Sequence, residues 1–348
     1  MLYKLCLIGY GAAHMLLAGY VLSRRLVQPR DLIIIDPSHD GGALLRDWPH
    51  VISNTTYQQF LDALTLLSIP HPNCSSQYNP ASPTELQCLA HGLRSSVATL
   101  LGTNVTRVYG YVSKLERDAT EPWRITVGKQ TYIALNASIA IGGTPRALPT
   151  QTPQIPLQRA FTVTDLATYI KPEAGTPEPL TVFGASHSGA LIVQAAVQLG
   201  CNVNLVYNTP QPFYFADEGA YEGVKLETAV LARQILADGL GGKVRLIPYS
   251  DALTVHSVLL QSAWCVSACG FEMTHYPQVF VDGRALHTES SLPYNPANAL
   301  ICPRLYAWGI GFPSTTTLDG RTYVDVSIPS FAAHIAAQQV QLAADLLS

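Results

Sequence analysis

The chain has 348 residues, of which 48% are hydrophobic and only 13% are charged, and its formal net charge at pH 7 is −3. This composition predicts a folded protein with a large buried core and argues against a disordered chain. The small net charge, without a strongly basic block, argues against nucleic-acid binding. The length is sufficient for two or three domains.

The sequence contains seven cysteines, and none of them belongs to a Cys-x-x-Cys pair. An odd number without that spacing argues against a disulfide framework, a zinc site and a redox-active dithiol. We therefore predict reduced thiols, no bound metal and a cytoplasmic protein. In that compartment the Asn-x-Ser/Thr triplets at Asn54, Asn73, Asn104 and Asn136 carry no meaning as glycosylation sites.

The apolar stretch at the start of the chain is similar to a signal peptide, but Gly9, Gly11 and His14 interrupt it. A strand, a helix and a second strand explain the segment better than a cleaved leader. No later apolar run approaches the length of a membrane span, so we expect no membrane contact. The predicted strand, helix and strand occupy residues 3–8, 12–25 and 32–35.

The turn between the first strand and helix reads Gly9-Tyr-Gly11-Ala12-Ala-His14. Glycines in this pattern are typical of a turn that cradles a dinucleotide pyrophosphate, because the helix N-terminus offers N–H donors and a favourable dipole. His14 stands where the third glycine is usual. Either the helix lies further from the strand, or the imidazole points toward the ligand. An ordinary strand–turn–helix with incidental glycines is the alternative.

The second strand ends at Asp36, which Pro37 follows. An acidic residue at this position supplies the acceptor that a ribose hydroxyl pair needs. The middle of the chain predicts a loop leading into a helix, a polar loop, a second helix and two alternating segments that resemble antiparallel strands. These elements occupy residues 40–60, 70–83, 84–101, 105–112 and 123–127.

A buried strand starting at Ala137 ends in the tight turn Gly142-Gly143-Thr144, and a proline-rich linker follows at 149–179. A second strand–turn–helix then begins at residue 181. Its turn contains Gly184, Ser186, His187, Ser188 and Gly189.

Ser186 can donate its hydroxyl to a phosphate, and Ser188 lies near the helix start, where serine caps well. A structural capped turn is the alternative. A hydrolase based on Ser186 and His187 is a weaker interpretation, because the glycine spacing differs from that of a nucleophile elbow.

The second unit continues with a helix at 188–199 and a strand at 203–207. That strand ends in Tyr207-Asn208, without an acidic residue for a ribose diol or an arginine for a 2′-phosphate, so NADH and NADPH both stay open. Later elements are a helix, a strand that ends near Gly270, a strand running into Gly309-Ile310-Gly311, and a last helix. The two helices occupy residues 225–239 and 329–347.

Several segments together resemble the two-dinucleotide-domain flavoproteins, which include pyridine-nucleotide-dependent reductases and flavin-containing and N-hydroxylating monooxygenases. The resemblance covers nearly the whole chain and is strongest for a branch with a GASHSG turn. It rests on the two glycine turns, the segment Ile141–Arg146, and the segments 212–215, 268–272 and 308–313.

The resemblance implies an α/β fold in which a Rossmann-like FAD domain is interrupted by a second Rossmann-like NAD(P) domain. The FAD domain would comprise 1–155 and 275–348, and the inserted domain 156–274. It also implies FAD as one cofactor and NADH or NADPH as the other.

Carried over by motif, the residues of the first turn, with Asp36 and Pro37, would hold the pyrophosphate and the adenosine ribose of FAD. The segment Trp48 to Thr55 would approach the flavin ring, and Asn54 is the candidate catalytic residue, with a helix cap as its alternative role. The expected cofactor-binding residues are Gly9, Gly11, Ala12, His14, Asp36, Pro37, Trp48, Asn54, Thr55, Gly142, Gly143, Thr144, Gly184, Ser186, His187, Ser188, Gly189, Gly309, Ile310 and Gly311.

Three departures from the family pattern bear on the reaction. The late turn has Ile310 where relatives commonly have an aspartate for the ribityl hydroxyls. The linker lacks the Phe-x-Gly-x3-His pattern of the oxygenating branch, and the missing Cys-x-x-Cys excludes dithiol chemistry.

The leading hypothesis is an FAD-dependent oxidoreductase reduced by NAD(P)H, which passes electrons to oxygen or a small organic substrate. A flavin-dependent monooxygenase is the alternative, and a non-catalytic nucleotide-binding or scaffold protein is the alternative of another class. A small-molecule substrate is the expected partner, and a homodimer stays open. Loops 70–83, 209–224 and 284–298 would supply substrate contacts, with His71, His275 and His287 as candidate acid–base groups.

Overall fold

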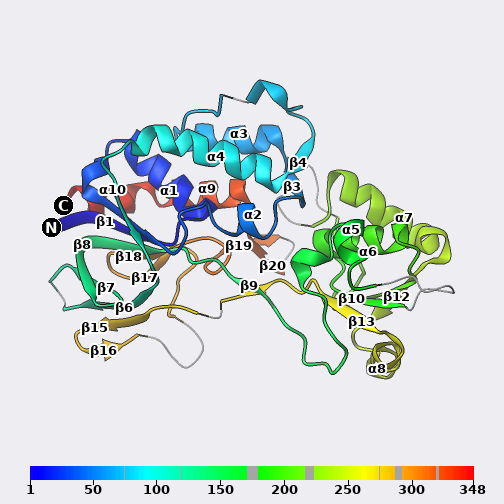
Figure 1. Ribbon diagram of the computed structural model, residues 1–348. Coiled ribbons are helices and arrows are strands. Elements are labelled where there is room, and N and C mark those ends of the chain that lie inside the picture. Colours follow the sequence, from blue (N-terminus) through cyan, green and yellow to red (C-terminus); the bar gives the residue numbers. More distant parts are fainter. Residues whose placement is uncertain are drawn as a thin grey trace. The chain divides into compact units, whose positions relative to one another are not determined.

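The computed structural model describes residues 1–73, 75–118, 120–170, 179–215, 223–273, 275–286, 292–318 and 321–348. The backbone forms two compact units. Unit 1 comprises Met1–Pro49, Thr55–Gly143 and Met273–Ser348, and unit 2 comprises His50–Asn54 and Thr144–Glu272. The expected α/β class, with one unit interrupted in sequence by another, is confirmed (Figure 1). The functional domain limits at 155 and 275 stay predictions.

Five parallel strands form the centre of unit 1. β1 lies in the middle, with β2 and then β5 on one side and β8 and then β18 on the other. Counted in chain order, this arrangement is the 3-2-1-4-5 order of a Rossmann sheet. The strands are β1 (Leu2–Ile8), β2 (Leu32–Asp36), β5 (Thr106–Tyr109), β8 (Gln130–Ile139) and β18 (Leu305–Ala307).

The two faces of this sheet bury alternate side chains of the same strands. Leu5 and Leu7 of β1 pack into a layer of helices, whereas Cys6 and Ile8 pack against strands on the other face. Burial on both faces explains why the strands read as continuous apolar runs. The helices of unit 1 are α1 (Ala12–Ser23), α2 (Ala43–Arg46), α3 (Tyr57–Leu66), α4 (Leu86–Leu101), α9 (Ile328–Ala337) and α10 (Gln339–Leu347).

β8 takes part in two kinds of pairing. Its first half pairs antiparallel with β7, and its second half pairs parallel with β18. The other strands of this sheet are β6 (Val112–Arg117), β7 (Trp123–Val127), β15 (Gln278–Val281), β16 (Arg284–Ala285) and β17 (Leu300–Cys302). Shorter two-stranded pairs are β3 (Ile52–Thr56) with β4 (Pro83–Glu85), and β19 (Ser314–Leu318) with β20 (Arg321–Asp325).

Two expectations about unit 1 are wrong. The run 105–112 is not one antiparallel strand: β5 ends at Tyr109 and runs parallel to β2, and β6 begins at Val112 after Gly110 with φ +153°. The last helix is interrupted at Gln338, whose N–H bonds to Ile335 O instead of continuing the α-helical pattern. Residues 40–60 also contain more structure than a loop, namely α2 and β3.

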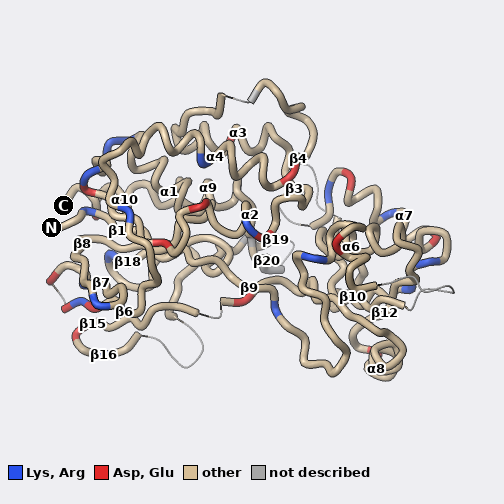
Figure 2. The backbone as a smooth tube through the Cα atoms, viewed as in Figure 1, with Lys and Arg blue, Asp and Glu red and all other residues tan. Residues whose placement is uncertain are grey.

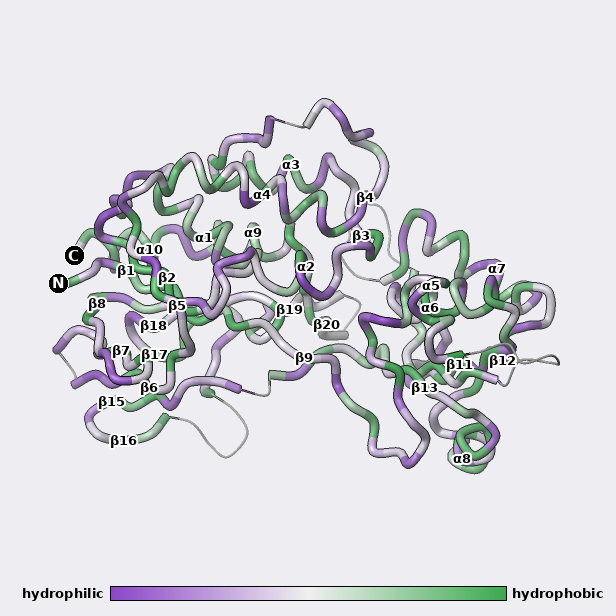
Figure 3. Tube along the Cα trace, viewed as in Figure 1, coloured by the Kyte–Doolittle hydropathy of each residue, from purple (hydrophilic) through white to green (hydrophobic). Residues whose placement is uncertain are grey.

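Unit 2 has its own sheet of four parallel strands in the order β12-β11-β10-β13. In chain order this is again 3-2-1-4. Phe183, Val206 and Ile247 pack against Val255 and Val258 of α8, and Figure 3 shows the hydrophobic character of strands such as β13. The elements are β9 (Thr144–Pro145), α5 (Val163–Leu166), β10 (Leu180–Phe183), α6 (His187–Gln198), β11 (Val203–Tyr207), α7 (Leu226–Gly242), β12 (Val244–Pro248), α8 (Ala252–Gln261), β13 (Trp264–Ser267) and β14 (Phe271–Glu272).

Positions of Lys, Arg, Asp and Glu are sparse along the described backbone, and both signs are scattered over it (Figure 2). In the parts of the chain that the structure describes, no helix is both long and apolar enough to span a membrane.

Candidate functional site

The chain leaves β1 through Gly9, where three parallel strands end close together. Gly9 has φ +92°, and a Cβ at this position would overlap the carbonyl oxygen of Ala140 after β8. Its N–H donates to the carbonyl of Ile35 at 2.8 Å, which ties the turn to β2. Only glycine accepts both the backbone conformation and the close approach.

Helix α1 begins directly after this turn without a side-chain cap. Gly11 is its N-cap, the first turn contains no acidic residue, and a Cβ on Gly11 would meet nothing within 4 Å. Gly42 approaches from the loop after β2, where a Cβ would lie 2.9 Å from the Gly11 Cα. The first N–H groups of α1, at the positive end of the helix dipole, are therefore suited to an anion.

The late glycine turn closes on the same region of unit 1. Gly309 has φ +84°, and a Cβ there would lie 3.1 Å from the Ala13 Cβ in the first turn of α1. A Cβ on Gly311 would lie 2.7 Å from the carbonyl oxygen of Gly142. The structure thus brings the first, middle and late glycine turns together around the start of α1.

His14 is fully buried beneath the turn. Its Nδ1 lies 2.7 Å from the carbonyl oxygen of Gly9, and its Nε2 lies 2.7 Å from Ser138 Oγ. Because a carbonyl only accepts, Nδ1 carries the proton and Nε2 accepts from the serine hydroxyl. Burial lowers the pKa of His14 to about 4, so the ring is neutral. Both ring nitrogens are engaged inside the protein, and a role in cofactor binding stays a prediction.

Asp36 organises the loop that follows β2. Its Oδ2 accepts the Tyr10 N–H at 2.7 Å, and its Oδ1 accepts the N–H groups of Ser38 and His39 at 2.9 and 2.7 Å. Burial alone would raise the pKa of Asp36, but these backbone donors, with the Ser38 hydroxyl, outweigh it and lower the pKa. The carboxylate is therefore charged and holds the ends of β1 and β2 together.

The turn of unit 2 repeats this geometry. Gly184 has φ +105°, a Cβ there would overlap the Ala268 carbonyl oxygen, and its N–H donates to Val206 O at 2.8 Å. Gly189 corresponds in position to His14, and a Cβ on Gly189 would overlap the Gly184 carbonyl oxygen. Here the third glycine of the pattern is retained, and the helix lies directly against the turn.

Ser186 is the exposed N-cap of α6 and makes no capping hydrogen bond, and the first turn has no acidic residue. The next residue, His187, donates from Nε2 to the Ile52 carbonyl at 2.9 Å, while its Nδ1 lies 3.2 Å from Thr228 Oγ1. Burial lowers the pKa of His187. Its nitrogens are engaged by other residues, so the geometry does not make His187 a base for Ser186.

The remaining predicted residues divide between the units. Asn54 belongs to unit 2, where its Nδ2 donates to Gly223 O at 3.0 Å and its buried Oδ1 has no partner among the described residues. Trp48 and the buried Thr55 belong to unit 1, whereas the exposed Thr144 pairs through β9 with β14 in unit 2.

Of the other predicted positions, the exposed Pro37 follows Asp36, and three positions are half-buried: Gly143, Ile310 and Ser188. Among the histidines of the expected substrate loops, His71 bonds to Thr65 Oγ1, and His287 lies outside the described residues. Sequence reasoning did not assign Gly42, Tyr10 or Ser138 to the first site, although the Gly41-Gly42 pair was a visible signal.

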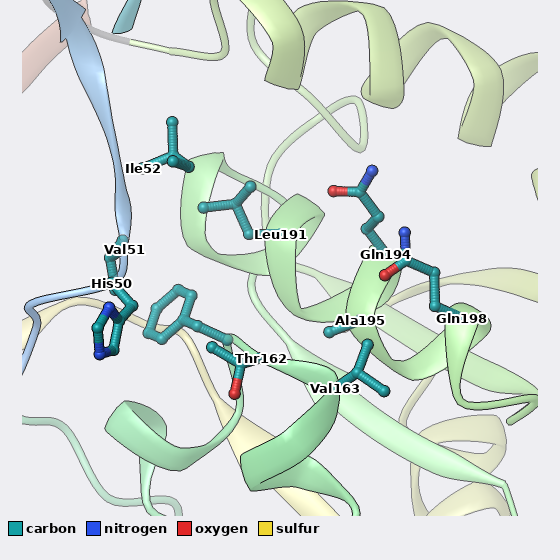
Figure 4. Close-up of a pocket in the computed structure, with 10 residues that line it drawn as sticks. His50, Val51, Ile52, Thr162, Val163, Leu191, Gln194, Ala195 and Gln198 are labelled. Carbon is teal, nitrogen blue, oxygen red and sulfur yellow. The ribbon is translucent and has the colours of Figure 1, made fainter. Parts of the chain in front are cut away.

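A cavity of about 260 Å³ lies beside α6 in unit 2 (Figure 4). Val51, Ile52 and Leu191 contribute apolar walls, and Gln194 and Gln198 bring two amides. These glutamines lie in the second half of α6, away from the turn at its N-terminus. The cavity is therefore separate from the expected phosphate site, and its residues come from distant segments that no sequence motif connects.

Neither a protein-family model nor a curated protein sequence matches the chain. Solved structures match it over nearly its whole length. They include bacillithiol disulfide reductase from Staphylococcus aureus, with a TM-score of 0.58, 13% identity and 99% of each chain covered. Thioredoxin reductase from Lactococcus lactis matches with a TM-score of 0.54, 14% identity and 99% of each chain covered.

A flavin-containing monooxygenase from Stenotrophomonas maltophilia matches with a TM-score of 0.60 and 13% identity, covering 99% of this chain and 98% of that one. At such low identity these likenesses establish the fold alone. The two-unit α/β architecture is thus one that reductases and a monooxygenase share.

The contact at Gly189 predicts a specific loss of stability. Alanine favours a helix more than glycine does, yet in Gly189→Ala the methyl group would overlap backbone at Gly184 O. We expect a net destabilisation of about 1–3 kcal/mol in urea unfolding of the purified protein. Gly11→Ala is the matched control, because its Cβ meets nothing within 4 Å and its φ is −87°. Equal stability of Gly189→Ala and wild type would contradict this packing.

His14 predicts a pH dependence of stability. Its pKa is near 6.5 in an unfolded chain and about 4 in the folded protein, so the unfolded state binds more protons between these values. The contribution of neutral His14 to the free energy of unfolding is fully present above about pH 6.5 and is lost as the pH falls toward 4. Between pH 7 and pH 5, we expect the free energy of unfolding of the wild type to fall by about 2 kcal/mol more than that of His14→Gln. The exposed His256→Gln should follow the wild type, and parallel curves for wild type and His14→Gln would refute the prediction.

Proposed function

We propose that the chain is an FAD-dependent oxidoreductase, reduced by NADH or NADPH, that passes electrons to oxygen or to a small organic substrate. The observation that carries this proposal is the repetition of one arrangement. Each unit has a group of parallel strands in its sheet. The first of these strands lies between two others and leads through a glycine turn into a helix whose N-cap makes no side-chain hydrogen bond. Such turns lie at the carboxyl ends of the strands, where open α/β sheets bind nucleotides.

The residues of unit 1 fit FAD. The open space beside Gly11 and the uncapped N–H groups of α1 suit a pyrophosphate, with Gly9 and Ala12 in the same turn. Asp36 would accept from the adenosine ribose, and Gly309–Gly311 would approach the ribityl chain or the ring. In this proposal, residues 1–155 and 275–348 form the FAD domain.

The residues of unit 2 fit a second dinucleotide. The Ser186 hydroxyl makes no capping hydrogen bond and can donate to a phosphate. Gly184 and Gly189 let the helix start close to the strand. Residues 156–274 would form this NAD(P) domain. β11 ends in Tyr207-Asn208, which selects neither NADH nor NADPH by charge.

When bound, the isoalloxazine ring of FAD would supply the two-electron redox chemistry. The protein would bind and orient the dinucleotides through the two turns, and His14 would keep the first turn fixed as a neutral ring. The sequence holds no Cys-x-x-Cys pair, so the proposed acceptor is reached without a protein dithiol of that kind.

Monooxygenase activity is the second candidate function. It is supported by Asn54, whose Nδ2 is fixed on Gly223 O while its Oδ1 has no partner among the described residues. An amide oxygen held in this way can accept a hydrogen bond from a bound ligand. Substrate-dependent oxygen consumption with a hydroxylated product would distinguish it from an oxidase, which forms peroxide alone.

Binding of FAD should depend on the charge at the start of α1. Asp and Asn both cap helices well, so Gly11→Asp and Gly11→Asn should both fold, but only the carboxylate repels a pyrophosphate. We expect wild type and Gly11→Asn to bind FAD in fluorescence titrations, and Gly11→Asp to bind at least about tenfold more weakly. A wild-type protein that binds no FAD would refute the proposed function, and equal affinities of the two variants would move FAD away from this turn.

The same comparison at Ser186 tests the second nucleotide. With FAD bound, we expect Ser186→Asp to raise by at least about tenfold the NAD(P)H concentration required for half-maximal anaerobic flavin bleaching, and Ser186→Asn to change it much less. Both variants should retain the FAD content of wild type. An unchanged concentration dependence in Ser186→Asp would place the nicotinamide dinucleotide elsewhere.

A further inference from the structure

His39 is a buried histidine in the loop after β2, and the turn motifs do not include it. Its Nε2 lies 2.9 Å from the carbonyl oxygen of Val108, and its ring meets Tyr109 edge-on at 4.6 Å between centroids. Because a carbonyl only accepts, Nε2 carries a proton, and in the neutral ring Nδ1 then presents a lone pair. This buried Nδ1 has no hydrogen-bond partner among the described residues.

The hydrogen bonds of Asp36 show why a second acceptor is needed here. Its Oδ1 already accepts from the Ser38 N–H, the Ser38 hydroxyl and the His39 N–H. Among the described residues, Oδ2 accepts only from the Tyr10 N–H. A carboxylate oxygen has about two lone-pair positions, so Oδ1 is saturated and Oδ2 can take one more donor. A ribose presents two neighbouring hydroxyls, of which Asp36 can therefore serve one.

We propose that His39 Nδ1 accepts the hydrogen bond of one adenosine ribose hydroxyl of FAD, while Asp36 Oδ2 accepts that of the other. This inference rests on the proposed function. The two acceptors belong to one turn, because the His39 N–H donates to Asp36 Oδ1 at 2.7 Å. A ligand hydroxyl would also relieve the cost of a buried acceptor without a partner.

The assignment makes His39 a specificity residue for ribose over deoxyribose. A purely structural His39 would support the loop equally for every adenine nucleotide. A His39 that accepts from the adenine amino group would also be indifferent to the ribose hydroxyls. Ligands that differ in a single ribose hydroxyl therefore distinguish the proposed role from structural support of the loop and from adenine binding.

The test is displacement of FAD from the full-length protein by ADP, 2′-deoxy-ADP and 3′-deoxy-ADP, followed by FAD fluorescence. In wild type, each deoxy analogue should bind about three- to tenfold more weakly than ADP. In His39→Phe, which keeps an aromatic ring beside Tyr109, one of the two penalties should disappear and the other should remain. His256→Phe, at an exposed position of unit 2, should keep both penalties.

His39 has a left-handed backbone with φ +54°, so His39→Asn, a residue that tolerates this conformation, provides a second variant with a shorter side chain. It should lose the same penalty as His39→Phe. Retention of both penalties in the two His39 variants would overturn the inference while leaving the proposed function intact. Failure of the wild type to bind FAD would overturn both.

Discussion

Both units depend on how closely the helix after the first strand approaches the carbonyl of the first turn glycine. In unit 2, Gly189 lies so close to Gly184 O that a single methyl group would overlap it. In unit 1, His14 occupies the equivalent position and replaces that contact by a hydrogen bond to Gly9 O. Each solution fixes the direction of the helix, and with it the N–H groups that would hold a phosphate.

The two solutions differ in their physical consequences. In unit 2 the position is occupied by Gly189, which has no titratable side chain. The imidazole of unit 1 ties α1 to β8 through Ser138, and its burial disfavours the protonated ring, which makes the stability of the first glycine turn dependent on pH. Asp36 joins the ends of β1 and β2, because its carboxylate accepts hydrogen bonds from backbone N–H groups that follow both strands. Only part of its hydrogen-bonding capacity is then left to accept from a ligand.

The elements with strong local signals could be predicted from the sequence. β11 occupies Val203–Tyr207 as expected, and the glycine turns lie where strands meet helices, because positive φ and close approach both require glycine. The direction of strand pairing could not be predicted, because the alternation of apolar and polar residues at 105–112 is compatible with both parallel and antiparallel neighbours. The break at Gln338 occurs without a glycine or proline to signal it, at a residue whose side-chain amide donates to Ala297 O at 2.9 Å.

The candidate site was only partly predictable for a similar reason. Motifs identified Gly9, Gly11 and Asp36. They do not show that His14 hydrogen-bonds to Ser138, which is more than a hundred residues away in the sequence. Two features are properties of the folded loop: Asp36 Oδ1 is saturated with donors, and His39 Nδ1 has no hydrogen-bond partner among the described residues. No spacing rule reports them, because they depend on which backbone groups a side chain meets.

In the proposed function, hydride passes between two dinucleotides, one held at each turn. The most direct measurement is anaerobic stopped-flow reduction of the FAD-loaded protein with NADH or NADPH carrying deuterium at either C4 position. The account predicts flavin bleaching that is slowed several-fold by deuterium at one of the two positions. FAD-loaded protein that neither nucleotide bleaches at any concentration would contradict it.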